Sequence, residues 1–363
     1  MSNTAIVLTD GGLHTSSAKT AHGLIRGTER FKIVGIIDAV NAGKDAGEVL
    51  DGKHRNIPIF DSVENAHKAL GAVAYCIIGI ALAGGKLPQG LVESLKTAIT
   101  LKMNLINGLH EFLNDMPELV ELARKHEVTL TDVRRPKKAS EMQYWSGRIT
   151  KVTTPRVAVL GTDCALGKRT TARFLVEACR KAGLKAEMIY TGQTGWMQGS
   201  KYGFIFDSTL NDFITGELET AIVECFEHEH PDVMFLEGQS SLRNPVGPAG
   251  SEFLVSGQAK YVVLQHSAVR KCFKGTDEFG LEIPSVKSEI ELIRFYGAET
   301  LAVTLNTATM PLDEARAAQA ALQADIGIPV VLPIEDGVDV VVQQIQHIVA
   351  SSPDQQRSHN HNP

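Results

Sequence analysis

The amino-acid sequence predicts an α/β protein with two units, each built on a parallel sheet. Short apolar runs of strand length alternate with helical patterns along the whole chain, which is typical of parallel strands joined by crossover helices. The stretch 134–155 interrupts this alternation, because it loses apolar periodicity and gains charge. A second run of alternation follows. In both units we expect ligands to bind at the carboxyl ends of the strands.

The first unit is assigned to residues 1–136 and is predicted to be Rossmann-like. It begins with the strand "TAIVLT" (4–9), a glycine turn and the helix "SAKTAHGLIRG" (17–27). Asp38 ends the second strand where Rossmann domains hold a ribose, but the absence of a complete GxGxxG motif argues against a dinucleotide site. The other expected elements are strands at 31–38, 74–81, 103–108 and 128–133, and helices at 61–70, 91–101 and 116–126.

A linker is predicted at 137–152, and the second unit is assigned to residues 153–350. The polar tail 351–363 is predicted to be disordered. In the second unit we expect strands at 156–163, 185–192, 233–239, 261–266, 300–306 and 329–333, and helices at 168–183 and 217–230.

Composition and charge limit the classes of partner. The net charge is -6 and no long block of arginine and lysine is present, so we expect small-molecule partners and no nucleic acid. No apolar run reaches membrane-spanning length and no signal-peptide pattern is visible. The 5 cysteines are scattered without a CxxC pair, which favours a reducing compartment. We therefore expect a cytoplasmic protein that does not bind membranes.

The stretch "GTDCALGKRTTA" (161–172) lies between an apolar strand and a helix, the setting of a phosphate-binding P-loop. Backbone N–H groups and the helix N-terminus form an anion pocket, which Lys168 completes. P-loop NTPases normally place a Ser or Thr magnesium ligand after this lysine, but Arg169 stands there, and Thr170 is rotated by about 100° along the helix. We therefore predict a P-loop NTPase-like domain that needs no metal and holds phosphates without transferring them, as for coenzyme A. The expected cofactor-binding residues are Gly161, Thr162, Asp163, Cys164, Ala165, Leu166, Gly167, Lys168, Arg169 and Thr170.

Two residues at strand ends are the candidates for acid–base catalysis. Glu237 ends the strand of "VMFLEGQ" and is either a general base or a structural carboxylate. His266 follows another strand and is either an acid–base group or a structural histidine. Cys164 lies near a helix N-terminus, where the pKa of a thiol falls. It is therefore either a nucleophile or an ordinary residue at a variable position of the loop.

Two further regions are predicted to bind the substrate. "TGQTGW" (191–196) follows a strand as a loop that either wraps a small polar substrate or packs its Trp in a turn. The segments after the strands at 233–239 and 261–266 carry cations that either bind a dianionic substrate or lie on the surface. The expected substrate-binding residues are Gln193, Trp196, Ser240, Arg243, Arg270 and Lys271.

Two resemblances extend this interpretation. The pattern GTDxxxGK resembles the dethiobiotin synthetase branch of P-loop proteins, and that resemblance implies an adenine contact from Asn306. The segments "KTAHGLIRG", "NGLHEFL", "DVRRP", "GTDCALGKRTTA", "TGQTGW" and "LEGQSSL" resemble a two-domain family that includes D-glutamate N-acetyltransferases. This family implies acetyl-coenzyme A as the donor and D-glutamate as the acceptor. The alternatives are an ATP-dependent ligase or kinase of the dethiobiotin synthetase type, and a nucleotide-binding module without catalysis.

The N-terminal unit has two possible roles. His110, Asp132 and Arg134 follow strands, and they either close over the C-terminal site or belong to a packing domain that builds an oligomer. We expect a homo-oligomer.

Overall fold

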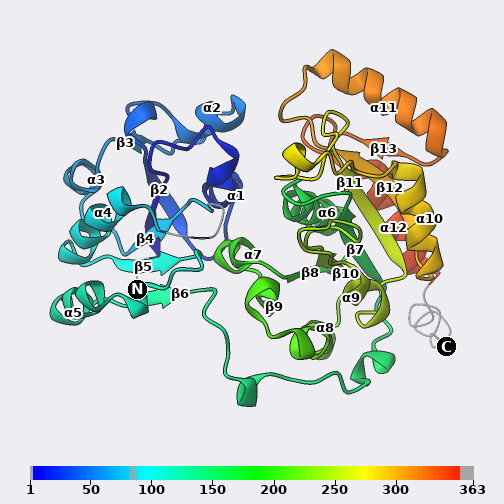
Figure 1. Ribbon diagram of the computed structural model, residues 1–363, viewed down its shortest axis with the longest axis horizontal. Helices are drawn as coiled ribbons and strands as arrows, with labels where there is room; N and C mark the ends of the chain where they lie inside the picture. Colours follow the sequence, from blue (N-terminus) through cyan, green and yellow to red (C-terminus); the bar gives the residue numbers. More distant parts are fainter. Residues whose placement is uncertain (1–2, 82–84, 86, 352–363) are drawn as a thin grey trace. The chain divides into compact units, whose positions relative to one another are not determined.

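The computed structural model describes residues 3–81, 85 and 87–351, and its chain divides into two units (Figure 1). Unit 1 consists of Met1–Lys137 and Gln193–Ser200, and unit 2 of Lys138–Gly192 and Lys201–Pro363. The chain therefore passes from unit 2 into unit 1 after Gly192 and returns after Ser200. The predicted disordered tail lies outside the described residues from position 352 onward.

Unit 1 is built on six parallel strands, β1 (Thr4–Leu8), β2 (Lys32–Ile37), β3 (Ile59–Phe60), β4 (Tyr75–Ile78), β5 (Asn104–Asn107) and β6 (Leu130–Asp132). Their order in the sheet is β3-β2-β1-β4-β5-β6. The central strand β1 pairs with both β2 and β4, so the strand order reverses at this point, as in the Rossmann fold. The predicted Rossmann-like domain is thereby confirmed.

The helices of unit 1 are α1 (Lys19–Arg26), α2 (Ala46–Asp51), α3 (Val63–Leu70), α4 (Gln89–Thr100), α5 (Pro117–His126) and α7 (Gln193–Gln198). These helices cover both faces of the sheet. Alternate residues of a strand point to opposite faces, so the residues of β1 pack in two different cores. Ile6 and Leu8 of β1 pack in one core with α3, α4 and α5, whereas Ala5 and Val7 pack in another with α1, α2 and α7. Short 3-10 turns lie at Ser16–Ala18, Ala39–Asn41 and Leu113–Asp115.

Unit 2 is built on seven parallel strands, β7 (Arg156–Gly161), β8 (Ala186–Tyr190), β9 (Tyr202–Gly203), β10 (Val233–Glu237), β11 (Tyr261–His266), β12 (Glu299–Leu305) and β13 (Val330–Val331). Their order is β13-β12-β11-β7-β10-β8-β9. The buried strand β7 lies between β11 and β10. Parallel neighbours end at the same edge of a sheet, so Gly161, Glu237 and His266 all lie at one edge.

The helices of unit 2 are α6 (Lys168–Lys181), α8 (Ile214–Glu229), α9 (Ser251–Val255), α10 (Val286–Phe295), α11 (Leu312–Ile326) and α12 (Asp339–Ala350). Ala158 and Leu160 of β7 share a core with α8, α9, α10 and α11, while α6 and α12 contact each other and the sheet. In the part of the chain that the structure describes, no helix has the length and apolar character needed to cross a membrane.

Polar side chains cap the N-termini of α2, α3 and α10. Asp45 accepts hydrogen bonds from the N–H groups of Gly47 and Glu48 before α2. Ser62 and Ser285 likewise accept from the N–H group three residues later, at the starts of α3 and α10. Such capping satisfies N–H groups that have no partner inside the helix.

The stretch predicted as a linker at 137–152 is ordered against α8. It contains 3-10 turns at Ala139–Glu141 and Arg148–Lys151. The buried carboxylate of Glu219 accepts hydrogen bonds from the N–H groups of Ser146 and Ile149, at 2.6 and 3.1 Å. Burial favours a higher pKa for Glu219, but these hydrogen bonds outweigh it and the pKa is lowered. The segment from Lys138 onward therefore packs as part of unit 2.

The stretch 191–196 differs from the predicted loop. Gln193–Gln198 form the short helix α7, and the structure assigns 193–200 to unit 1. These residues fall within the predicted second unit, residues 153–350. The difference has a physical reason: Met197 is fully buried in the core shared with α1, and Trp196 packs against that core.

Candidate active site

The loop that follows β7 encloses the side chain of Lys168. Ala165 and Gly167 have positive φ angles of 53° and 102°, and Gly167 precedes the first residue of α6. A Cβ atom added at Gly161 would lie 3.1 Å from Cδ and 3.2 Å from Nζ of Lys168. Glycine at this position lets the lysine side chain pass close to the backbone, as in a phosphate-binding loop.

The ammonium group of Lys168 is buried within this loop. The residue is 7% exposed, and Nζ donates to the carbonyls of Asp163 and Ser240, each at 2.7 Å. Ser240 follows β10 and has a φ of 40°. Lys168 therefore joins the P-loop to the segment after β10. The predicted substrate residue Ser240 presents its carbonyl to this lysine.

Asp163 connects the P-loop to two other segments. Its fully buried carboxylate accepts hydrogen bonds from Asn244 Nδ2 and the Cys164 N–H through Oδ1, and from Arg270 Nη1 and the Lys274 N–H through Oδ2. These four distances lie between 2.7 and 2.8 Å. The carboxylate thus shapes the site by fixing the segments that follow β10 and β11.

His266 at the end of β11 lies beside the P-loop. Its Nδ1 is 2.9 Å from Oγ1 of Thr162, and its carbonyl accepts a hydrogen bond from the N–H of Asn306. Asn306 follows β12, and its Nδ2 donates to the carbonyl of Leu166 at 2.8 Å. Four residues predicted from sequence to belong to the site are therefore in direct contact.

Glu237 lies at the end of β10 and is 5% exposed. Its Oε2 accepts a hydrogen bond from the N–H of Thr191 at 3.0 Å. Burial raises the pKa of Glu237 above its ordinary value, against the charge of Arg169 and the hydrogen bond from Thr191. A carboxylate with a raised pKa is a better proton acceptor than an exposed carboxylate.

His266 has the opposite electrostatic character. Burial, together with the nearby charge of Arg270, lowers the pKa of His266 to about 4. The imidazole is therefore neutral at neutral pH, but it is a weak base there. Of the two predicted acid–base residues, Glu237 has the environment better suited to accept a proton.

This environment makes the stability of the protein depend on His266 below neutral pH. Because the folded pKa is depressed, the unfolded chain binds a proton between its ordinary value near 6.5 and about 4, while the folded chain does not. The stability that His266 contributes is present above the ordinary pKa and is lost as the pH falls through the folded pKa. We expect His266→Asn to reduce the acid-dependent loss of stability by about 1–2 kcal/mol. Thermal unfolding at pH 7.5 and pH 4.5 measures the change, and an equal loss in both proteins would contradict it.

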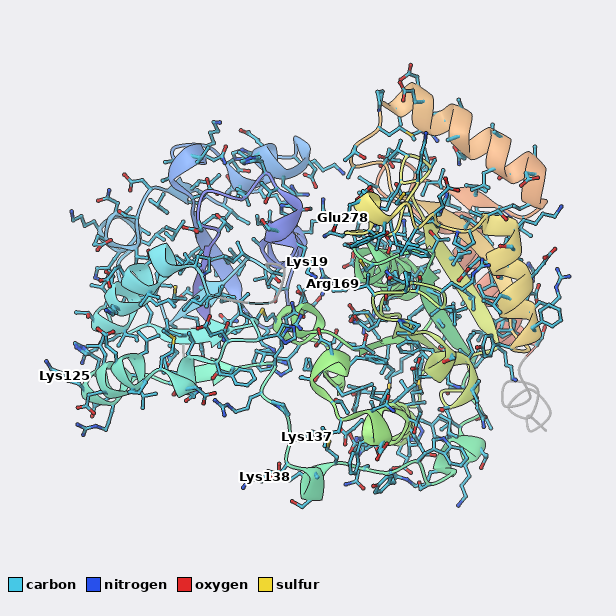
Figure 2. All side chains as sticks on the ribbon, viewed as in Figure 1. Lys19, Lys125, Lys137, Lys138, Arg169 and Glu278 are labelled. Carbon is cyan, nitrogen blue, oxygen red and sulfur yellow. The ribbon has the colours of Figure 1, made fainter. Side chains whose placement is uncertain are left out.

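Arg169 occupies the position after Lys168, at the start of α6 (Figure 2). Its positive charge opposes the rise in the pKa of Glu237. Among residues 3–81, 85 and 87–351, no group of three or more His, Cys, Asp or Glu side chains is arranged to hold a metal ion. Arg169 thus places protein charge where P-loop NTPases usually have a metal ligand.

Cys164 has the environment of an unreactive thiol. Burial and the negative charge of Asp163 raise its pKa, against the charges of Lys168, Lys274 and Arg270. The thiol is therefore protonated at neutral pH, which argues against the nucleophile alternative.

Arg243 and Arg270, two of the three cations predicted to bind the substrate, have protein partners. Arg243 donates through Nε to Glu289 of α10 at 2.6 Å, and Arg270 pairs with Asp163 at 2.7 Å. Their side chains remain 31% and 28% exposed. Lys271 is exposed. The two arginines have structural roles that their sequence positions did not reveal.

Gln193 and Trp196 are held within unit 1. Gln193 Oε1 accepts a hydrogen bond from Arg134 Nη2 at 2.8 Å. The Arg30 guanidinium lies 4.1 Å from the centre of the Trp196 ring, and its Nε donates to the Trp196 carbonyl. The predicted alternative of a packed Trp describes this environment better than a loop around substrate.

The carboxylates at strand ends of unit 1 are also engaged by their own domain. Asp38 accepts from the Thr9 hydroxyl and the Leu13 N–H through Oδ2, and from Asn41 through Oδ1. Asp132 accepts from Asn107 Nδ2 at 2.8 Å. Asp38 therefore stabilises its own turn, which agrees with the missing GxGxxG motif.

Several residues that support the site were not predicted from the sequence. Gln265 Oε1 accepts from the hydroxyls of Thr171 on α6 and Thr304 on β12, at 2.5 and 2.8 Å. Asn244 holds Asp163, and Thr191 holds Glu237. A polar residue inside the apolar strand 261–266 was the available signal for Gln265. Asn244 and Thr191 carried no such signal.

One parallel sheet carries a glycine loop after its central strand, and the other sheet has the strand order of the Rossmann fold. The chain is therefore a two-domain protein with a P-loop domain and a Rossmann-like domain. Residues 143–342 match the family described as "Domain of unknown function (DUF1611_C) P-loop domain", and residues 39–136 match "Domain of unknown function (DUF1611_N) Rossmann-like domain". The chain belongs to this DUF1611 family.

Relatives and a solved structure agree with this assignment. A protein from Pseudoalteromonas sp named D-glutamate N-acetyltransferase is 30% identical over 283 residues, which cover 76% of this chain and 82% of the relative. A protein of the same name from Tritonibacter scottomollicae is 28% identical, over 82% of this chain and 88% of the relative. The crystal structure of a DUF1611 family protein from Anabaena variabilis has a TM-score of 0.86 at 29% identity, over 95% of this chain and 99% of that protein.

Proposed function

We propose that this protein is an N-acetyltransferase that transfers the acetyl group of acetyl-coenzyme A to the amino group of D-glutamate. The observation that carries the proposal is Glu237, a buried carboxylate with a raised pKa at the strand end beside the P-loop. The names of the two relatives support the reaction and its acceptor. The donor is inferred from the chemistry of the loop.

The donor set of the loop fits a phosphate-bearing co-substrate. Lys168 and Arg169 begin α6, and the Lys168 ammonium group donates to the carbonyl of Asp163 in the preceding loop. Helix N-termini and such loops bind phosphate oxygens. We infer that Gly161–Thr170 hold the pyrophosphate of coenzyme A, and that Asn306 contacts its adenine base. Neither role needs a magnesium ion.

Glu237 supplies the proton acceptor in this proposal. The amino group of an amino acid is mostly protonated at neutral pH, so it must lose a proton before it attacks the thioester carbon. Glu237 accepts one proton from the ammonium group. Attack then forms the C–N bond, loss of the thiolate breaks the C–S bond, and the second proton from nitrogen goes to the thiolate, so the products are the amide and free coenzyme A. The raised pKa of Glu237 brings it closer to neutrality, where a general base is most effective.

The acceptor has two carboxylates, which we assign to the exposed parts of Arg243 and Arg270 and to Lys271. Both arginines remain partly exposed while they pair with Glu289 and Asp163. These internal pairs fix the guanidinium groups in place, and a planar guanidinium group can contact a second carboxylate. The recognition of D-glutamate then relies on cations that are already oriented.

The purified protein tests the proposal directly. We expect it to release coenzyme A from acetyl-coenzyme A only when D-glutamate is present, and to form N-acetyl-D-glutamate in equal amount. Thiol release and chiral chromatography with mass spectrometry measure the two products. Equal rates with L-glutamate would remove the stereochemical part of the proposal. Hydrolysis of Mg-ATP coupled to D-glutamate, without acetyl transfer, would favour the ligase or kinase alternative, and nucleotide binding without turnover would favour the non-catalytic module.

Chelation separates the proposed donor from a metal-dependent nucleotide. Because Arg169 replaces the usual magnesium ligand, we expect the Kd of acetyl-coenzyme A to be unchanged within error in excess EDTA. Calorimetric titration with and without EDTA measures this, and Mg-ATP serves as the comparison ligand. A loss of acetyl-coenzyme A affinity on chelation would overturn the proposal that the loop needs no metal.

A further inference from the structure

A short hairpin, residues 271–283, follows β11 along the chain. The Phe273 N–H donates to the carbonyl of Leu281 at 3.0 Å, and the Ile283 N–H donates to the carbonyl of Lys271 at 2.8 Å. These hydrogen bonds join the two arms of the hairpin in an antiparallel arrangement. Phe273 is 4% exposed, so the first arm has a buried aromatic side chain. The hairpin is therefore an ordered part of unit 2.

Asp163 of the P-loop holds this hairpin at the loop. Its fully buried carboxylate accepts a hydrogen bond from the Lys274 N–H through Oδ2 at 2.8 Å. Arg270, the residue before the hairpin, donates through Nη1 to the same oxygen and to the carbonyl of Cys164, each at 2.7 Å. The backbone of Lys274 is therefore fixed beside residues 163 and 164. The contact uses only this backbone and does not involve the ammonium group.

The ammonium group of Lys274 adds positive charge to this edge of the P-loop. Burial and the negative charge of Asp163 raise the pKa of the Cys164 thiol, and the positive charge of Lys274 is among those that oppose this rise. Lys274 is exposed, and within the part of the chain that the structure describes its ammonium group forms no ion pair. The charge is thus near the loop, accessible to solvent and available to an anionic ligand.

The order of the strands places this charge between two parts of the proposed donor site. The strand β11 pairs with β7, which leads into the P-loop, and with β12, which Asn306 follows. Parallel strands end at the same edge of a sheet, so the segment after β11 begins between the P-loop and Asn306. The proposed function puts the pyrophosphate of coenzyme A at the P-loop and its adenine base at Asn306. The ribose, which carries a 3′-phosphate, joins these two groups and therefore lies over the end of β11.

We propose that Lys274 binds the 3′-phosphate of coenzyme A and thereby selects this donor over acyl thioesters that lack the phosphate. A phosphate monoester carries about 1.5–2 negative charges at neutral pH, and an ammonium group binds it as a point charge. The inference rests on the proposed function, because the positions of the pyrophosphate and the adenine come from it. It adds a donor contact outside the loop Gly161–Thr170 and leaves Arg270 and Lys271 to the acceptor.

The experiment compares two donors, acetyl-coenzyme A and acetyl-3′-dephospho-coenzyme A, in steady-state acetyl transfer to saturating D-glutamate by the full-length protein. We expect the wild type to favour acetyl-coenzyme A in kcat/KM by about 5- to 30-fold, the range for a partly exposed hydrogen bond between charged groups. Lys274→Gln should raise the KM of acetyl-coenzyme A by this factor and leave the KM of the dephospho donor unchanged. The kcat with both donors should stay the same, because the 3′-phosphate takes no part in the reaction at the thioester.

The variants are chosen so that the hairpin stays in place. Residue 274 keeps its N–H in each of them, so the contact with Asp163 remains and the Tm should not change. Lys274→Arg keeps the charge and should keep most of the preference. Lys287→Gln changes an exposed lysine of α10 and should behave as wild type with both donors. Lys271→Gln, within the hairpin, should raise the KM of D-glutamate and leave the ratio between the two donors unchanged.

The outcomes separate this inference from the proposed function. Failure of the wild type to acetylate D-glutamate with either donor removes the proposed function, and this inference with it. Equal kcat/KM for the two donors in the wild type leaves the acetyltransferase in place and overturns the recognition of the 3′-phosphate. A wild-type preference that Lys274→Gln retains assigns the phosphate to another residue and also overturns the inference. Calorimetry with coenzyme A and 3′-dephospho-coenzyme A measures the same preference as a ratio of Kd values without turnover, and this preference should disappear in Lys274→Gln.

Discussion

Replacing Glu237 by Gln is expected to lower kcat for acetyl transfer by about 10²–10⁴-fold, the usual contribution of a general base. The substitution keeps the shape of the side chain and removes the proton acceptor. Acetyl-coenzyme A should bind with unchanged Kd, because the loop Gly161–Thr170 is intact. Activity should recover in part at high pH, where free amine accumulates without help from the protein. Initial rates from pH 6 to pH 10 measure both effects.

The stability of the same variant shows whether Glu237 belongs to the site or to the fold. Since burial raises its folded pKa, the stability linked to its proton is present below the ordinary pKa and is lost as the pH rises through the folded pKa. The charged form therefore destabilises the protein at neutral pH, and Glu237→Gln should have an equal or higher Tm there.

Glu219→Gln is the matched control for a buried carboxylate in unit 2. Burial favours a higher pKa for Glu219, but hydrogen bonds from Ser146 and Ile149 lower it below its ordinary value. This stability is present above the ordinary pKa and is lost as the pH falls through the folded pKa, so Glu219→Gln should have a lower Tm at neutral pH and a normal kcat. A Glu237→Gln protein with near-normal kcat across the pH range would exclude Glu237 as the base and leave His266 to be tested.

The sequence predicted the two domain folds because their signals are local. Apolar runs of strand length separated by helical patterns require crossover helices, and crossover helices require parallel strands. The glycine spacing of 161–167 and the adjacent Lys168 likewise describe one continuous segment, whose backbone geometry follows from those residues. The contact of His266 with Thr162 could not be predicted in this way, because the sequence does not show which strands are neighbours in the sheet.

The roles of individual charges could not be predicted in the same way. The ion pairs of Arg243 and Arg270 were not predicted, because their partners Glu289 and Asp163 lie 46 and 107 residues away in the chain. The position of α7 was missed for a related reason. Its hydrophobic residues fit either unit, and only the contacts of Gln193 and Trp196 with Arg134 and Arg30 decide which. Pairing over such distances is fixed by tertiary packing, which local patterns do not contain.

Lys168→Ala is expected to raise the KM for acetyl-coenzyme A by about 10- to 100-fold, which corresponds to the loss of a hydrogen bond to a charged group. In this proposal Lys168 contacts the phosphates, which are equally charged before and during acetyl transfer. Its loss therefore weakens ground-state and transition-state binding alike, so kcat should change little. Steady-state kinetics with the donor varied at saturating D-glutamate separates the two parameters.

The structure also shows what else this substitution removes. The Lys168 ammonium group holds the carbonyls of Asp163 and Ser240, so the variant should have a lower Tm, and added acetyl-coenzyme A should raise its Tm less than that of the wild type. Lys181→Ala, at the exposed far end of the same helix, is the control and should behave as wild type in both assays. A fall in kcat with unchanged donor affinity would place Lys168 in the chemical step. The loop Gly161–Thr170 would then do more than hold the donor, because Lys168 would contact negative charge that forms only as the thioester reacts.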